Sequence, residues 1–212
     1  MQISRRHLVL GGSAAVGLAA TAGAQKLVPT SSQDLGPFYP LIRPSDEDAD
    51  LTRVRGLKGV ASGDPINVIG RLLDVKGNPV SGARVELWQA NALGRYDHPG
   101  DAASTAALDP NFQGYASLVS DDQGRFRFRT IKPGHYSIGG GLRRTRHIHF
   151  DIRGRSERLI TQMYFPGEEL NDSDILLRNA NPRESVMARA TDRLSGDPNA
   201  AAFAWDVILN VG

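Results

Sequence analysis

Apolar and polar residues alternate in short runs over much of this chain, and a period of two is typical of β-strands with one buried face. Turn-forming residues (Gly, Pro, Asn and Asp) separate the runs. The pattern predicts eight strands, at residues 66–75, 83–89, 115–120, 125–130, 135–138, 147–152, 159–165 and 204–211. Short strands in this number predict an all-β fold, an antiparallel β-sandwich with Greek-key-like connections.

The segments between the strands carry further predictions. The turn sequence Asp121-Asp122-Gln123-Gly124 predicts a hairpin between the third and fourth strands. The irregular stretch 97–113 is of a length that indicates a functional loop. One short helix is predicted over 182–194, where Pro182 suits the first helical position and the apolar residues recur at helical spacing.

The first 24 residues have the pattern of an export signal. The pair Arg5-Arg6 precedes an apolar stretch, residues 8–22, and Ala22-Gly23-Ala24 matches a cleavage site. The arginine pair resembles the twin-arginine signal that exports folded bacterial proteins, so we expect a periplasmic or secreted protein. An uncleaved anchor is the alternative, but the apolar stretch is shorter than the ~20 residues of a membrane span, and we expect no stable span.

We divide the remaining chain into an extended arm over residues 25–65 and a β-sandwich domain over residues 66–212. Its composition limits the kinds of functional site that it can form. No cysteine is present, which excludes disulfides, thiolate metal sites, iron–sulfur clusters and cysteine nucleophiles. Any metal must bind through His, Tyr, Asp or Glu. Two of the 25 Lys and Arg lie in residues 1–24, with no acid, so the remaining basic residues balance the 23 Asp and Glu. This neutrality argues against a nucleic-acid partner.

His147 and His149 occupy alternate positions of one predicted strand, so both imidazoles project from the same face. Two imidazoles on one face can share a metal ion. The pair alone is a weak signal, because neighbouring histidines on an exposed strand are common. Two other histidines lie close in sequence to tyrosines in glycine-containing turns. His98 follows Tyr96 by two residues, and His135 directly precedes Tyr136.

Eight short motifs run in order through almost the whole chain after the signal. They lie at residues 36–39 (GPFY), 85–91 (VELWQAN), 94–96 (GRY), 108–112 (LDPNF), 130–134 (TIKPG), 144–150 (RTRHIHF), 161–165 (TQMYF) and 205–206 (WD). Together they resemble the intradiol ring-cleavage dioxygenases, and within that family they are most similar to the protocatechuate 3,4-dioxygenase β chains. The resemblance implies a β-sandwich core with long active-site loops, in agreement with the strand pattern.

The resemblance also implies a non-haem Fe(III) ion whose ligands fall on Tyr96, Tyr136, His147 and His149. Tyrosinate is a hard, anionic oxygen donor, and two of them favour Fe(III) over Fe(II). The ordinary pKa of tyrosine is ~10, so the bound cation must stabilise the phenolates and its binding should release protons.

The implied reaction inserts both atoms of O2 into a catechol-type aromatic substrate and yields a cis,cis-muconate. By the same resemblance, Tyr136 takes a catechol proton as a base. Arg144 stabilises negative charge on the ring, and Gln162 supports it from beside the site. Family members that act on protocatechuate combine two different chains, so a homo-oligomer or a hetero-oligomer with a related chain is expected.

Other interpretations remain open for these residues. Each tyrosine can be a core residue, Arg144 one of several solvated arginines, and Gln162 a surface residue. Trp88 is predicted to be a buried anchor of the sandwich. An exported, transthyretin-like module that binds an aromatic or a metal without turnover is an alternative function, and a zinc or copper site at the histidine pair is another.

One departure from the family pattern concerns the substrate. Residues 137–143 are shorter and richer in glycine than the tryptophan-containing stretch expected in protocatechuate enzymes. The chain alone therefore leaves open protocatechuate, a catechol, a hydroxyquinol or a larger ring. Pro37, Phe38 and Tyr39 are expected to line the mouth of the substrate cavity, by analogy with relatives.

Overall fold

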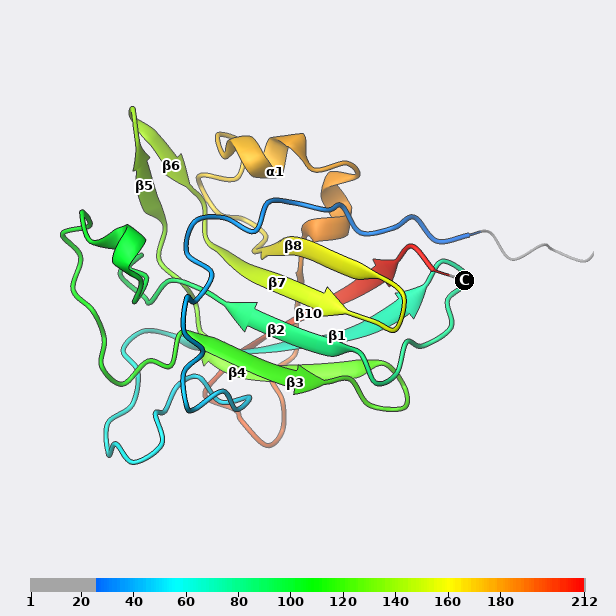
Figure 1. The fold of residues 1–212 in the computed structure, drawn as a ribbon, viewed down its shortest axis with the longest axis horizontal. Coiled ribbons are helices and arrows are strands. Elements are labelled where there is room, and N and C mark those ends of the chain that lie inside the picture. The colour runs from blue at the N-terminus through cyan, green and yellow to red at the C-terminus, as the bar shows by residue number, and fades with distance from the viewer. Residues whose placement is uncertain (1–25, 212) are drawn as a thin grey trace, which may run out of the picture.

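A computed structural model describes residues 26–211, which form a β-sandwich flanked by long loops (Figure 1). The strands are β1 Pro65–Asp74, β2 Arg84–Trp88, β3 Tyr115–Val119, β4 Arg125–Ile131, β5 Tyr136–Gly139, β6 Leu142–Arg144, β7 His147–Arg153, β8 Arg158–Tyr164, β9 Arg189–Thr191 and β10 Ala201–Leu209. One short α-helix, α1 Ile175–Asn179, and two 3₁₀ turns, Pro99–Asp101 and Arg183–Val186, complete the elements of this part of the chain.

The strands form two four-stranded sheets, ordered β4-β1-β10-β9 and β3-β2-β7-β8, and a separate β5-β6 hairpin. All pairs are antiparallel except β1 and β10, which run parallel with Ile66 opposite Ala201. The predicted all-β sandwich is therefore confirmed, with one parallel pair inside an otherwise antiparallel arrangement. The eight predicted strands all occur, within a few residues of their predicted bounds.

The core lies between the inner faces of the two sheets. Alternate residues of the long strands point inward, such as Val85 and Leu87 on β2 and Phe126 and Phe128 on β4, and these four are buried. Gly70 on β1 stands opposite Phe126, whose ring takes the place of a side chain: a Cβ on Gly70 would lie 2.4 Å from Phe126 Cζ. The core thus requires glycine at this position.

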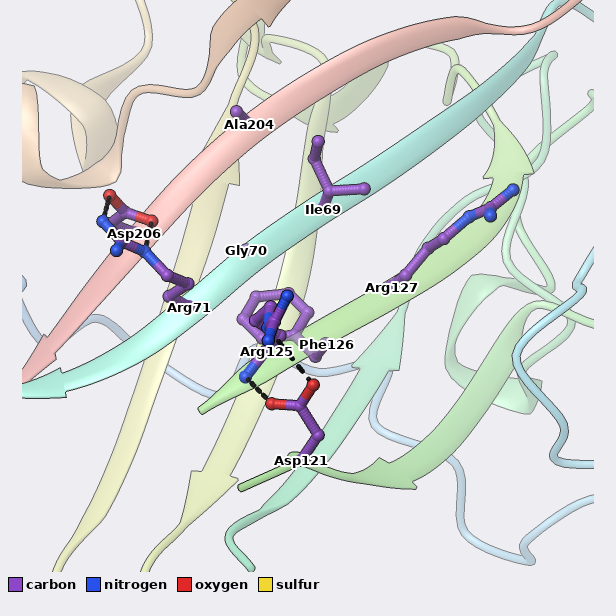
Figure 2. Close-up of a pocket in the computed structure, with 9 residues that line it drawn as sticks. All are labelled: Ile69, Gly70, Arg71, Asp121, Arg125, Phe126, Arg127, Ala204 and Asp206. Atoms are coloured by element: carbon purple, nitrogen blue, oxygen red, sulfur yellow. Dashed lines mark hydrogen bonds and ion pairs between the residues drawn. The ribbon is translucent and has the colours of Figure 1, made fainter. Parts of the chain in front are cut away.

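The outer face of sheet β4-β1-β10-β9 holds a shallow hollow of about 500 Å³ above Gly70, with an apolar floor that includes Ile69 and Ala204 and charged side chains around it (Figure 2). Two ion pairs flank this hollow, Arg71 with Asp206 and Arg125 with Asp121. Each arginine side chain is more than half exposed, and pairs of this kind contribute little to stability. The third arginine at the hollow, Arg127, donates instead to the side-chain oxygen of Asn67.

The predicted hairpin between the third and fourth strands is wrong. The turn at residues 121–124 is present, but β3 and β4 belong to different sheets. The turn instead carries the chain from one layer of the sandwich to the other. The alternation that predicted both strands is correct, because each strand has one inner face, yet alternation carries no information on which strands pair.

The predicted helix over 182–194 is also wrong. Only a 3₁₀ turn forms, at Arg183–Val186, and the chain then enters strand β9. The buried residues here are Val186 and Ala188, a spacing of two, whereas Ala190 is exposed. Pairing of β9 with the edge of β10 therefore prevails over the helical spacing of the apolar residues.

Residues 26–64 form no helix or strand of their own, and residues 33–47 cross sheet β3-β2-β7-β8 from β8 to β3 (Figure 1). Gln33 N donates to Ile160 O on β8, and Ser117 N on β3 donates to Glu47 O. Between them, the Tyr39 hydroxyl donates to the buried carboxylate of Glu86 on β2, at 2.8 Å. This segment consequently covers one end of the sheet.

No helix among residues 26–211 has the length and hydropathy that crossing a membrane requires. The predicted export signal at residues 1–24 lies outside the described residues.

Candidate active site

The candidate site lies at one end of sheet β3-β2-β7-β8, on the face directed away from the core. Four outward side chains stand side by side in register across the four strands: Tyr115, Trp88, His149 and Gln162. His147 lies two residues before His149 on β7 and therefore points to the same face, whereas the intervening side chain enters the core. The structure thus places both imidazoles on one face of one strand.

The two tyrosines reach this face from neighbouring loops. Tyr96 follows β2, and Tyr136 is the first residue of β5. The loops are in direct backbone contact at Gly94, where a Cβ would lie 2.3 Å from the carbonyl oxygen of His135. Gly94 also has φ of +79°, a conformation that side chains disfavour. Glycine here lets the two loops pack together and sets Tyr96 beside Tyr136, ring centroids 5.5 Å apart.

All four predicted metal ligands converge. Tyr136 Oη lies 3.4 Å from His147 Nε2, which lies 3.2 Å from His149 Nε2. The Tyr96 ring is 6.3 Å from the His149 ring, centroid to centroid. Three separated segments therefore bring two phenol oxygens and two imidazole nitrogens into one cluster.

Burial keeps both imidazoles neutral. Desolvation lowers the pKa of His147 and of His149 well below the ordinary value, and the nearby charge of Arg144 lowers both further. His147 Nδ1 lies 2.7 Å from the carbonyl oxygen of Thr145, which orients the ring with Nε2 toward the cluster. A neutral imidazole with a free Nε2 lone pair is the form that binds metals.

Burial shifts the pKa values of the two tyrosine phenols in the opposite direction, upward. Desolvation raises the pKa of Tyr96, and the neighbouring Tyr136 raises it further. Desolvation also raises the pKa of Tyr136, although the charge of Arg144 opposes the shift. Both hydroxyls are therefore protonated at neutral pH unless a cation stabilises the phenolates.

The donor set fits a ferric ion. Tyr96 Oη is buried and has no hydrogen-bond partner among residues 26–211, which costs free energy unless a ligand completes it. No group of three His, Asp or Glu side chains in this part of the chain is arranged to hold a metal, so tyrosine oxygens must complete any site at the histidine pair. Two hard oxygen and two imidazole donors suit trivalent iron better than a soft metal.

Arg144 lies beside the cluster at the end of β6 and is almost wholly buried. Its Nη2 donates to Gln162 Oε1 at 2.6 Å and to Tyr164 Oη at 3.1 Å. Its Nε donates to Asp174 Oδ2 at 2.8 Å. The predicted contact between Arg144 and Gln162 is therefore present, and the guanidinium plane is fixed on two sides.

Asp174 connects this arginine to helix α1. Its Oδ1 accepts from the backbone N–H groups of Leu176 and Leu177 as an N-cap, while its Oδ2 accepts from Arg144 and from Thr145 N. The carboxylate is completely buried; one oxygen caps α1 and the other holds Arg144 and the following residue, so Asp174 connects the helix to the end of β6. Sequence reasoning missed Asp174, because the only signal was an Asp before a five-residue helix that lacks apolar periodicity.

A cleft of about 1010 Å³ opens onto the cluster. Tyr136, Arg144 and His149 line it, whereas Tyr96 and His147 lie behind them. Of the three residues expected at the mouth, Pro37 and Phe38 line the cleft. Tyr39 does not line it and instead packs against Trp88, ring centroids 5.0 Å apart.

Trp88 is more than the buried anchor that was predicted. It is buried, as expected, but its ring is stacked on His149 with centroids 4.9 Å apart. The contact follows from the register of β2 and β7, which places the two residues opposite each other and which the sequence alone did not provide.

Comparisons with known proteins agree with this geometry. The family model described as Dioxygenase (Dioxygenase_C) matches residues 35–211. The protocatechuate 3,4-dioxygenase β chain of Burkholderia cepacia is 39% identical over 184 residues, which cover 84% of this chain and 74% of that one. The 6-chlorohydroxyquinol 1,2-dioxygenase of Cupriavidus pinatubonensis is 39% identical over 128 residues, which cover 54% of this chain and 44% of that protein.

Among solved structures, the dioxygenase domain of a dioxygenase–carbohydrate-binding protein fusion from Streptomyces sp. SirexAA-E is similar, with a TM-score of 0.65 and 26% identity. The match covers 87% of this chain and all of that domain. The fold, the order of the motifs and the match over residues 35–211 lead to one conclusion: the chain belongs to the intradiol ring-cleavage dioxygenase family.

Proposed function

We propose that this protein is a non-haem Fe(III)-dependent intradiol dioxygenase that inserts both atoms of O2 into a catechol-type ring and yields a cis,cis-muconate. The observation that carries the proposal is the convergence of Tyr96, Tyr136, His147 and His149 beside a substrate-sized cleft. These four side chains would hold the ion through two oxygens and two nitrogens. When bound, ferric iron supplies Lewis acidity and an electron-accepting centre for a catecholate.

The chain's own residues then have distinct tasks. Tyr136 lines the cleft, so its Oη is in place to accept a proton from a substrate hydroxyl. Arg144 also faces the cleft and presents a permanent positive charge to negative charge that develops on the ring. Gln162 accepts a hydrogen bond from this guanidinium and thereby fixes its orientation.

The experiment is an oxygen-electrode screen of iron-loaded protein with catechol, protocatechuate and hydroxyquinol, followed by mass spectrometry of products formed under ¹⁸O₂. We expect one O2 consumed per ring and two labelled oxygens in a muconate-type acid. Tyrosinate-to-iron charge transfer should also give the protein a burgundy to brown colour that shifts when a catechol is added. A colourless, iron-replete protein without oxygen uptake would contradict the proposal and favour a binding module instead.

We also propose export by the twin-arginine route, with cleavage after residue 24, and assembly with further copies or with a related chain. Mass spectrometry of the periplasmic protein tests the cleavage site, and light scattering tests the assembly. Replacement of Arg5-Arg6 by two lysines should retain the full-length protein in the cytoplasm.

A further inference from the structure

Large apolar side chains surround the mouth of the cleft. Leu93 is 62% exposed, Ile138 is 50% exposed and Ile175 is 48% exposed. They come from three different elements, the loop after β2, strand β5 and helix α1, yet all three line the same cleft as Tyr136. Exposed apolar residues scattered singly need no explanation, but a set gathered around one cavity indicates a binding surface.

The cleft is larger than a single catechol ring requires. Its volume of about 1010 Å³ lies at the upper end of the range, about 300–1,000 Å³, that encloses ligands of drug size. The three glycines at the tip of the β5-β6 hairpin, Gly139 to Gly141, add no side chains, and no atom lies within 4 Å of the Cβ positions they lack. The mouth is consequently open beside Ile138.

The charges on the wall do not favour an acidic substituent. Two carboxylates, Asp34 and Asp101, line the cleft together with two arginines. The Arg144 guanidinium is paired with Asp174, at 2.8 Å, and Asp101 is paired with Arg95, at 3.7 Å. Arg143 donates to the ring of His135. The wall therefore has no excess of positive charge to balance a carboxylate on the substrate ring.

From these observations we infer that the substrate is a catechol with a bulky, uncharged, apolar substituent, such as an aryl or branched alkyl group, which Leu93, Ile138 and Ile175 contact. The inference rests on the proposed function, because the dihydroxylated ring must reach the tyrosine–histidine cluster. The substituent then extends outward along the same cleft to the apolar rim. Burial of the substituent against the rim supplies the selectivity.

The test compares kcat/KM for 4-tert-butylcatechol, catechol and protocatechuate with the iron-loaded protein. We expect kcat/KM for 4-tert-butylcatechol to exceed that for each of the other two by at least about tenfold. In Ile138→Ser, the ratio of 4-tert-butylcatechol to catechol should fall about tenfold. The matched control is Val119→Ser on β3, because Val119 is also a β-branched, largely exposed strand residue, at 64% against 50% for Ile138, but does not line the cleft. This control should leave the ratio unchanged.

A preference for protocatechuate, or an unchanged ratio in Ile138→Ser, would overturn the inference. Anaerobic calorimetry with the same three compounds separates this failure from failure of the proposed function. Tighter binding of 4-tert-butylcatechol that Ile138→Ser abolishes supports the apolar site even where no oxygen is consumed. Light scattering adds a further outcome: dissociation of an oligomer in Ile138→Ser, with unchanged selectivity, would assign the rim to a subunit interface and overturn the inference.

Discussion

The indole of Trp88 lies almost parallel to the imidazole of His149, with centroids 4.9 Å apart and planes 13° from parallel. His149 Nδ1 is buried and has no hydrogen-bond partner in the described part of the chain, in contrast to His147 Nδ1, which lies beside a carbonyl oxygen. Gly36 is also close, since a Cβ there would lie 3.1 Å from His149 Cε1. Stacking and packing, rather than a hydrogen bond at Nδ1, therefore orient this predicted ligand.

Trp88→Leu should weaken iron binding about tenfold, in the range found when groups that orient metal ligands are removed. Trp88 Nε1 itself has no hydrogen-bond partner among residues 26–211, so Trp88→Phe keeps an aromatic face and loses no hydrogen bond. The phenylalanine variant should recover most of the affinity. Chelator competition measures the iron affinity of both variants. Equal affinity of Trp88→Leu and the wild type would refute the role of Trp88 in orienting His149.

Replacement of the ligands themselves should separate binding from catalysis. His149→Ala should lose iron, because it removes one of two nitrogen donors. Tyr136→Phe should slow substrate binding more than it weakens iron, since its Oη faces the cleft and is the proposed proton acceptor. Iron content by elemental analysis and stopped-flow mixing with catechol distinguish the two effects. Small and equal effects would remove both proposed roles.

Asp174→Ala should destabilise the protein by about 3–5 kcal/mol, because it leaves the buried Arg144 guanidinium without its carboxylate. Loss of the helix cap contributes about 1 kcal/mol of this amount. Asp172→Asn is the matched control in the same loop: its carboxylate is 91% exposed, and its pair with Arg183 is a surface interaction. Urea unfolding of the iron-free protein measures both, and equal midpoints for the two variants would contradict the role of Asp174.

The iron-free protein should lose stability as the pH falls from 7.5 to 5.5. His147 and His149 have lowered pKa values in the folded state, so the unfolded chain binds more protons below its ordinary histidine pKa of about 6.5. The contribution is complete above that pH and is lost as the pH falls toward the folded-state pKa values. Thermal unfolding at several pH values checks this, and His149→Gln should flatten the dependence. If the pH dependence of stability is unchanged in His149→Gln, groups other than this histidine must cause it.

Alternation of apolar and polar residues sufficed to predict seven of the eight strands of the two sheets, because each of these has one face in the core; the exception is β9, whose three residues are all exposed. It could not predict the pairing of β1 with β10, which lie at opposite ends of the described chain. Helix α1 was missed because five residues are too few to show a recurring helical pattern of apolar positions. The helix depends instead on the Asp174 cap. Conversely, apolar spacing at residues 186–194 predicted a helix where pairing along β10 prevails.

The candidate site was predictable to a different extent. The strand period placed His147 and His149 on one face, but only the resemblance to a family connected them to Tyr96 and Tyr136, because no local pattern shows which loops meet. The residues that orient the cluster, Trp88 above all, act through contacts across strands. Such contacts depend on register, which a single sequence does not contain.

The central place of β10 in its sheet has a consequence for folding. Until residues 201–209 dock, β1 presents an unpaired edge, β9 has no strand to pair with, and the core lacks Phe203, Trp205 and Val207. Contacts between such distant segments form slowly, and open strand edges invite association with other chains. An intermediate with β10 undocked is therefore the species most prone to aggregate, and conditions that shorten its lifetime should raise the yield of native protein.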